Sequence, residues 1–454
     1  MHGPEGLQVE EASGGRGRPT VASTSFSLSS LGYRWRELLV EGVAAALAPV
    51  EALEQDGRWI CFPGEQAPFR TRVVIYEPLE ATPGTTFVEW LNVSGGLDAA
   101  PTWSTAHLEL IRSHARWVGV SAQQAGVTAL RGSDPDRYGA LHHPGDAWSY
   151  DIYRQVLALL RHEQDDGHLI ATGESQSAWR LVTWLNTADQ PHTLLDAALI
   201  HSRCAIAAPV SQAPCADVPA PDGAGLRTDL AVPVLVVQAE TDLFLRGHLR
   251  QDDSPTLREW EIAGAAHADL YTLLLGGADA GDGVAQQQLF DGLLTPTSAP
   301  IPGIIECTRP INTGPQHWVL QAAVQQVRRW AEHGQPPPPA PRLQLDPHAE
   351  GEVARDADGI ALGGVRSPHV DAPLAALSGT GQPRSDNWMC RLFGTTTPFS
   401  AEQLLARYGS RAGFLDAWSS AAREAVEAGW LLAEDLELLV RTAEQSVALR
   451  RLLP

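Results

Sequence analysis

One serine in this sequence lies where it could act as a nucleophile. Ser175 is the centre of GESQS at 173–177, between the apolar run HLIAT and a segment with helical periodicity. A serine on such a strand–turn–helix junction projects its hydroxyl above a sheet, where it can attack a carbonyl carbon. The pattern is GxSxS rather than GxSxG, but Gly173 and Ser177 are both small, as the close approach of strand and helix requires. A serine that only caps the helix is the alternative, and the preceding strand favours the nucleophile.

An acid and a histidine follow in the order that such a serine requires. The apolar run VPVLVVQ ends at Gln238 and is followed by two carboxylates, Glu240 and Asp242. Asp242 is the preferred acid because it lies three residues past the small turn residue Ala239, and Glu240 is its rival. Either one could instead be a solvated turn carboxylate.

The base is expected on the loop after the next strand. His267 stands in AGAAHAD, directly after REWEI, among residues small enough to let an imidazole reach back to the serine. It would accept the Ser175 proton through one ring nitrogen and donate to Asp242 through the other. His317, in GPQHW, is the second choice for this role.

Two backbone N–H groups should stabilise the oxyanion. One is that of Gln176, the residue after the nucleophile. The other is expected from Ser94, Gly95 or Gly96, because this loop follows the strand that supplies it and paired glycines let the backbone approach a substrate.

Substrate contacts are less well specified by the pattern. His201 and Arg203 follow a predicted strand at the same edge of the sheet, and Arg203 could bind a carboxylate through two parallel hydrogen bonds. It could equally be a structural ion-pair partner. Candidates for apolar pocket walls are Trp103, Trp148 and Trp179, although a tryptophan is more often simply part of the core.

Apolar runs alternating with helical segments predict the framework for these residues. The runs are nearly continuous, which is typical of parallel strands covered on both faces. Strands are expected at 72–76, 86–93, 117–121, 168–172, 195–201, 232–238 and 257–262, and helices at 149–162, 176–186, 319–333, 412–428 and 433–450, with a capping box at Ser400 and Gln403 before a further helix.

The chain divides into three parts by composition. Residues 1–22 are expected to be a mobile tail, and residues 23–334 a core that contains an insertion at about 202–229, either lid-like or an irregular loop. Residues 335–454 begin with the proline run QPPPPAPR and continue as an extension that we expect to dock on the core.

The formal net charge of −21 opposes binding to nucleic acid or to anionic membrane surfaces. No apolar run is long enough to span a bilayer. The five cysteines form no CxxC pair, which favours reduced thiols in a cytoplasmic protein and gives no sign of structural zinc. Whether Cys204 and Cys215 pair stays open, as does the oligomeric state. No motif implies a metal or another cofactor.

Together, several segments of the sequence resemble the bacterial and fungal alpha/beta hydrolase domain proteins with a GESQSA elbow. They are GESQSAWRL, EWLNVSGG, WVGVSAQ, RYGALHHPGD, AETD, EIAGAAHAD and GGVRSPHVDAP. The resemblance runs from about Thr71 to the C-terminus. It implies an α/β-hydrolase fold and esterase-like chemistry, with Ser175, Asp242 and His267 at the triad positions. It names no substrate.

The expected function is cleavage of a carboxylic ester of a small molecule through an acyl-enzyme on Ser175. Three alternatives stay open. The same triad could transfer, lactonise or cyclise the acyl group. The fold could be a catalytically dead binding protein, or a lyase or isomerase that uses His267 as its base.

Overall fold

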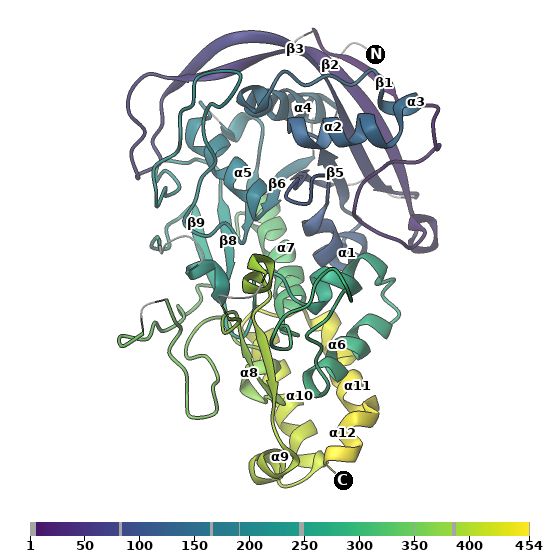
Figure 1. Cartoon of the computed structure of the whole chain (residues 1–454), viewed down its shortest axis with the longest axis vertical. Coiled ribbons are helices and arrows are strands. Elements are labelled where there is room, and N and C mark those ends of the chain that lie inside the picture. The colour runs from purple at the N-terminus through teal and green to yellow at the C-terminus, as the bar shows by residue number, and fades with distance from the viewer. Residues whose placement is uncertain are drawn as a thin grey trace.

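A nine-stranded sheet forms the centre of the molecule, as the computed structural model shows (Figure 1). The structure describes residues 6–80, 84–163, 167–189, 191–244, 249–349, 351–383 and 387–453. The strand order is β1-β2-β3-β5-β4-β6-β7-β8-β9. The pairs from β5 to β9 are parallel, and β1, β2 and β3 add an antiparallel edge. The strands are β1 Gln8–Glu11, β2 Tyr33–Pro49, β3 Cys61–Pro78, β4 Thr85–Trp90, β5 Arg116–Val120, β6 His168–Glu174, β7 Ala197–His201, β8 Val234–Ala239 and β9 Leu257–Ile262.

Helices cover both faces of this sheet. Helices α1 (Pro101–Arg112) and α7 (Gln316–His333) contribute to one large apolar cluster, and α4 (Ser149–Glu163) and α5 (Gln176–Thr187) to the other. Apart from His168, the residues of β6, β7 and β8 are buried because both faces of these strands meet helices, which explains their largely apolar sequence. The predicted α/β-hydrolase framework is therefore confirmed. The remaining helices are α2 Gln124–Ser133, α3 Pro135–Tyr138, α6 Val284–Leu294, α8 Pro368–Asp371, α9 Ala401–Tyr408, α10 Arg411–Glu427, α11 Leu436–Gln445 and α12 Val447–Leu452.

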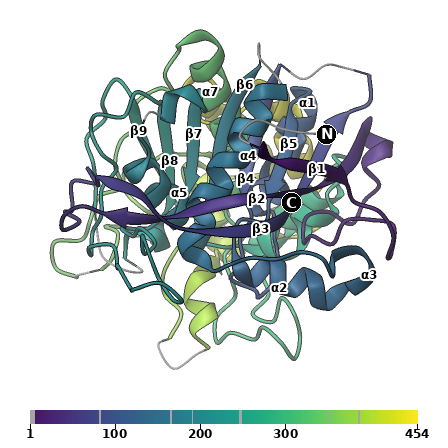
Figure 2. The same cartoon turned by 90° about the horizontal axis from the view of Figure 1, so that it is seen from above.

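The long hairpin of β2 and β3 was predicted only in part, since residues 72–76 of β3 were expected as a strand but β2 was not. Figure 2 shows it crossing above α4 and α5. It is held there by α4: the side chain of Asp151 accepts from the Ala45 N–H at 2.8 Å, and Gln155 donates to the Val43 carbonyl at 2.8 Å. The residues of β2 do not alternate cleanly between buried and exposed, so period-two alternation could not reveal the strand.

The N-terminal segment is not a free tail from residue 6 onward, which corrects the expectation for residues 1–22. Strand β1 pairs with β2 in antiparallel register, and Leu7 is buried beside it. Ala22 then forms a bridge with Ala99 next to α1. Residues 1–5 lie outside the described part of the chain. The apolar residues of this segment were too few to reveal the pairing, because the buried surface is supplied by distant strands.

The insertion at 202–229 packs beside α5, on the face of the sheet that α4 and α5 cover, and is not a lid. Ala207 and Val210 belong to the apolar cluster of that face. The Thr183 hydroxyl of α5 donates to the Ala208 carbonyl at 2.6 Å, and the Tyr150 hydroxyl donates to the Pro209 carbonyl at 2.5 Å. Its apolar residues are thus turned away from the carboxyl edge of the sheet.

The C-terminal extension shares the apolar core of the sheet domain. Trp418 of α10 packs edge-on against Phe290 of α6, and both belong to the cluster that covers the sheet. Val365 forms a parallel bridge to Ile262 at the end of β9. The capping box of Ser400 and Gln403 opens α9, and the predicted last helix divides into α11 and α12 at Ser446.

Two cysteines are oxidised, which corrects the expectation of reduced thiols. Cys307 and Cys390 form a disulfide, whereas no disulfide joins Cys204 to Cys215. The pairing joins positions 83 residues apart, so no local spacing could have revealed it. The thiol argument therefore no longer supports a cytoplasmic location. Among the described residues, no helix is both long and apolar enough to cross a bilayer.

Candidate active site

Ser175 lies at the turn between β6 and α5 with a backbone that few residues adopt. Its φ is 54° and its ψ is −122°, in the left-handed half of the map where a side chain is strained. Gly173 is required here because a Cβ atom would lie 3.0 Å from the backbone of Ser177. The Ser177 hydroxyl donates to the Glu174 carbonyl at 2.9 Å and accepts from the Glu174 N–H at 3.0 Å. The serine in place of the second glycine therefore braces the turn.

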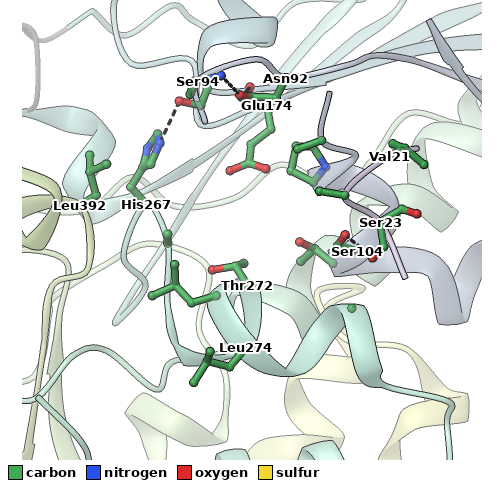
Figure 3. Close-up of a pocket in the computed structure, with 18 of the residues that line it drawn as sticks. Val21, Ser23, Asn92, Ser94, Ser104, Glu174, His267, Thr272, Leu274 and Leu392 are labelled. Atoms are coloured by element: carbon green, nitrogen blue, oxygen red, sulfur yellow. Dashed lines mark hydrogen bonds between the residues drawn. The ribbon is translucent and has the colours of Figure 1, made fainter. Parts of the chain in front are cut away.

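His267 bridges the serine and an acid. Its Nε2 lies 3.0 Å from the Ser175 Oγ, the contact that a dashed line from His267 marks in Figure 3. Its Nδ1 lies 2.6 Å from the Asp242 Oδ1. The second oxygen of Asp242 accepts the Ala239 N–H at 2.7 Å, which fixes the carboxylate at the end of β8. The structure thus brings together the three residues that the sequence reading proposed as nucleophile, base and acid.

Glu240 does not contact His267 and holds the surrounding loops instead. Its carboxylate accepts the Gly264 N–H at 2.7 Å, the Gly379 N–H at 2.9 Å and an ion pair from Arg355 at 2.5 Å. It therefore ties the histidine loop to the C-terminal extension. Thr241 lies between the two carboxylates in the sequence, and its hydroxyl oxygen accepts the His267 N–H at 3.1 Å, which also holds the histidine loop.

His317 is not available as a base. It is fully buried in α7 and stacks on Tyr271 with ring centroids 4.0 Å apart. Burial holds its pKa well below the ordinary value, so the ring stays neutral.

The charges around His267 favour a catalytic base. Burial opposes the imidazolium, but the negative charge of Asp242 and the hydrogen bond to it outweigh burial, and the pKa of His267 is raised. For Asp242, burial also opposes the charged form, and the interactions with His267 lower its pKa. Asp242 is therefore ionised and stabilises the imidazolium that forms when the serine proton is accepted.

A cavity of about 900 Å³ opens above Ser175 and His267. A wall of small hydroxyl residues faces the carboxyl edge of the sheet, and Trp179, Trp388 and Leu274 add apolar surface. The lining comes from residues 21–25, 92–105, 174–179, 267–278 and 388–392. The N-terminal segment and the C-terminal extension therefore form walls of the same cavity.

The oxyanion donors are constrained by Asn92. Its side chain donates to the Glu174 carbonyl at 2.9 Å and accepts the Ser94 N–H at 2.8 Å, so the N–H of Ser94 is already used. The Gly96 N–H donates to the Val93 carbonyl at 2.9 Å. Among the described residues, the N–H groups of Gln176 and Gly95 make no internal hydrogen bond. Of the donors that we predicted, these two are free to bind an oxyanion.

Of the three tryptophans, only Trp179 lines the cavity. Trp103 belongs to α1 and is fully buried against Tyr76 and Trp117. Trp148 is buried on the other face of the sheet, where its Nε1 donates to the Glu65 carbonyl at 2.9 Å. The large apolar area of both indoles is used in core packing, so the prediction that they wall the pocket is wrong.

His201 and Arg203 also lie outside the cavity, which corrects their predicted contact with substrate. Burial lowers the pKa of His201 to about 4, and its ring accepts from Gln316 at 3.2 Å. Gln316 also donates to the Ala266 carbonyl at 3.0 Å, so this pair supports the histidine loop from behind. Arg203 is buried and donates to the carbonyls of Cys204 and Ala224, which fixes the insertion.

The sequence reading overlooked two residues beside the nucleophile. Asn92 was part of EWLNVSGG, and an amide directly before a glycine loop was the signal that could have identified it. Glu174 immediately precedes Ser175, and its carboxyl group points into the cavity (Figure 3). A carboxylate at a buried strand end was a signal as well, but a strand sequence does not show that the side chain reaches the cavity.

Cys204, Asp242 and His267 also offer three potential metal ligands within 4.8 Å of one another. The His267 Nδ1 and the Asp242 Oδ1, however, are already 2.6 Å apart, the distance of a short hydrogen bond. A metal ion at this point would have to break that bond. The geometry is therefore that of a triad rather than of a metal site.

The chain matches a known protein family over nearly its whole length. A family model described as alpha/beta hydrolase domain matches residues 2–441. No curated protein is similar in sequence to the chain.

Solved structures with a similar arrangement include three hydrolases, all at low identity. A serine hydrolase homologue from Coxiella burnetii is 13% identical, with 44% of this chain and 84% of that chain covered and a TM-score of 0.30. A serine hydrolase without lid from Xanthomonas campestris is 13% identical, covering 48% and 84% with a TM-score of 0.26. Lipase A of Candida antarctica is 9% identical, covering 44% and 42% with a TM-score of 0.24. These scores are too low to carry an argument about activity.

Proposed function

This chain belongs to the alpha/beta hydrolase domain family, and from that premise we propose that it is a serine hydrolase that cleaves a carboxylic ester of a small molecule. The observation that carries the proposal is the imidazole of His267, which lies 3.0 Å from the Ser175 Oγ and 2.6 Å from Asp242. The cavity above these atoms supplies room for the substrate.

Acylation begins when the Ser175 Oγ attacks the ester carbonyl carbon. His267 accepts the hydroxyl proton through Nε2, while Asp242 keeps the other ring nitrogen protonated and stabilises the imidazolium. The carbonyl oxygen becomes an oxyanion, for which the free N–H groups of Gln176 and Gly95 are the proposed donors. Collapse of the intermediate breaks the carbon–oxygen bond, and His267 returns its proton to the departing alcohol.

Deacylation repeats these steps with water. His267 removes a proton from water, the hydroxide oxygen attacks the acyl carbon, and Ser175 leaves with the proton that His267 returns. The products are the free acid and a regenerated serine. If a substrate alcohol or amine replaced water, the same steps would transfer or cyclise the acyl group.

The test combines turnover with labelling. We expect the wild-type protein to hydrolyse 4-nitrophenyl butyrate and to be labelled by a fluorophosphonate on Ser175. Ser175→Ala should abolish labelling and lower kcat by about 10⁴-fold or more, the usual loss on removing a triad member. Ser420→Ala, on the distant helix α10, is the matched serine control and should change neither.

Failure would be plain in either readout. Undiminished turnover by Ser175→Ala would refute the nucleophile. A wild-type protein that neither turns over esters nor reacts with the fluorophosphonate would be a binding protein with an inactive site. Product analysis by mass spectrometry with a competing alcohol would distinguish hydrolysis from acyl transfer.

A further inference from the structure

Glu174 is a buried carboxyl group that the catalytic steps above do not use. Only 8% of the residue is exposed, and it belongs to the lining of the cavity beside Ser175. Figure 3 shows its carboxyl group extending into the space between His267 and the wall that carries Ser23 and Ser104. In the described part of the chain this carboxyl group has no hydrogen-bond or ion-pair partner.

A carboxyl group at a largely buried position costs free energy unless it gains a hydrogen-bond partner. Burial raises the pKa of Glu174 to about 7; the positive field of His267 acts against this, and the charges of Asp242 and Asp269 add to it. An apolar side chain at this position would avoid the cost of burial. Because its carboxyl group lines the cavity, a ligand that hydrogen-bonds to Glu174 does so from within the cavity.

The opposite wall of the cavity is rich in hydroxyl groups. Ser23, Thr24 and Ser25 come from the N-terminal segment, and the Thr24 hydroxyl is buried without a partner among the described residues. Ser104 and Thr105 of α1 continue this wall. The Ser25 and Ser104 hydroxyls donate to the carbonyls of Gly277 and Ser23, so toward the cavity their oxygens act as acceptors and match a ligand that carries several hydroxyl groups.

Two indoles complete the lining. Trp179 lies next to the nucleophile on α5, and Trp388 is 68% exposed in the C-terminal part of the lining. Aromatic faces offer apolar surface to the C–H groups of a polyol or a sugar ring, while the hydroxyl groups bind elsewhere. A carboxyl group, a hydroxyl wall and two indoles together favour a compact hydroxylated ligand.

A cationic ligand fits the same carboxyl group less well. Arg391 also lines the cavity, and its positive charge opposes an ammonium group. At a pKa of about 7, Glu174 is partly protonated near neutral pH, so it can accept from one hydroxyl group and donate to another. A neutral ligand also brings no second charge that must be desolvated.

We propose that the substrate is an ester with one or more free hydroxyl groups and that Glu174 selects it by hydrogen bonding to one of them. This inference rests on the proposed esterase function. The hydroxyl group can belong to the alcohol part, as in esters of polyols or sugars, or to a hydroxylated acyl group. Both have the same recognition chemistry.

The test compares ester pairs that differ by hydroxyl groups. Glycerol monobutyrate against propyl butyrate tests the alcohol side, and 4-nitrophenyl 3-hydroxybutyrate against 4-nitrophenyl butyrate tests the acyl side. In each pair we compare kcat/KM on the same protein, so any general loss of activity cancels. The wild-type protein should prefer the hydroxylated ester about tenfold or more in at least one pair, because a site built for a hydroxyl group rejects the analogue that lacks it.

Variants at Glu174 assign the preference to this residue. Glu174→Leu should reduce the ratio to near one, and Glu174→Gln, whose amide can still accept and donate, should keep part of it. The matched control is Glu109→Gln. Glu109 is also buried, with a pKa raised to about 7 by burial, but it lies outside the cavity lining, and the ratio should stay at the wild-type value.

Three results would overturn the inference. One is a wild-type protein that hydrolyses both members of each pair equally, which would leave the esterase proposal intact. Another is a preference that persists in both Glu174 variants. The third is a stronger preference for 4-nitrophenyl 4-aminobutyrate that is lost in Glu174→Gln, which would assign Glu174 to a cation. Absence of any ester turnover or fluorophosphonate labelling would instead refute the proposed function itself.

Discussion

Removing the charge of either carboxylate in the turn after β8 should impair a different property of the protein. Asp242 contacts His267, whereas Glu240 holds Gly264 and Arg355. We therefore compare Asp242→Asn with Glu240→Gln, two substitutions of the same chemical kind only two positions apart. The first should impair turnover and the second should impair stability.

The expected loss for Asp242→Asn follows from the tautomer of His267. An asparagine can present its NH₂ group to Nδ1, which would place the ring proton on Nε2 and leave no base facing Ser175. Comparable substitutions lower kcat by about 10⁴-fold, which corresponds to about 5 kcal/mol of transition-state stabilisation. The Ala239 N–H keeps an amide oxygen as acceptor, so unfolding should become easier by only about 1 kcal/mol.

Glu240→Gln removes the partner of Arg355 from a fully buried position and leaves a backbone donor less well satisfied. Breaking a buried pair on one side costs about 3–5 kcal/mol. The free energy of unfolding should fall by about 3 kcal/mol, because Arg355 is itself partly exposed and recovers some solvation. Below the unfolding transition, kcat/KM should fall by less than about tenfold.

The assay measures kcat/KM for 4-nitrophenyl butyrate and, separately, urea unfolding followed by circular dichroism. The reasoning would be refuted if Asp242→Asn kept more than about a tenth of the wild-type kcat/KM. It would fail equally if Glu240→Gln lost turnover as severely as Asp242→Asn while its unfolding curve stayed at the wild-type position.

Three further predictions follow from the site. Since His267 must be neutral to accept a proton and its pKa is raised by Asp242, kcat/KM should fall as the pH drops through an apparent pKa above the ordinary 6.5; a pH–rate profile with its midpoint below 6 would contradict this. Ser177→Val should lower both kcat and the free energy of unfolding, because it removes the two hydrogen bonds to the Glu174 backbone and adds bulk to the turn. Ser177→Gly removes the same hydrogen bonds without adding bulk and should retain far more activity. Losses of the same size in the two variants, measured by calorimetry and kinetics, would contradict this prediction. Cys390→Ser opens a disulfide that closes a long loop and should lower the unfolding free energy by about 3–5 kcal/mol, whereas Cys215→Ser, at a free and partly exposed cysteine, should leave the denaturation midpoint unchanged.

Local sequence was sufficient for the elbow and for the central strands. Ser175 follows a run of buried residues and begins a helix, and that strand–turn–helix order is encoded within about twenty neighbouring positions. The strands from β4 to β9 could be read because nearly all of their positions are buried and most of their residues are apolar or small. Of the hairpin of β2 and β3, the sequence predicted only residues 72–76; β2 was not predicted, because its burial depends on α4, which lies far along the chain.

The choice between the two acids needed the fold. Glu240 and Asp242 have the same chemistry in the same short turn, and only the path of the 3₁₀ turn at Glu240–Leu243 decides which one faces the histidine. The same is true of Trp103, Trp148 and Trp179: the residue type does not show whether an indole faces the core or the cavity.

The sequence by itself thus determined the order of the reactive groups and the strands that carry them, because strand pattern and turn chemistry act over short distances. The tertiary structure alone decided what surrounds them. Residues 21–25 and 388–392 reach the cavity because each segment buries apolar side chains against parts of the chain far away in sequence. Val21 packs on the apolar cluster of the sheet, and Cys390 and Leu392 pack in a smaller cluster with Tyr271. The carboxyl group of Glu174 points into the cavity because the elbow turns sharply at Ser175.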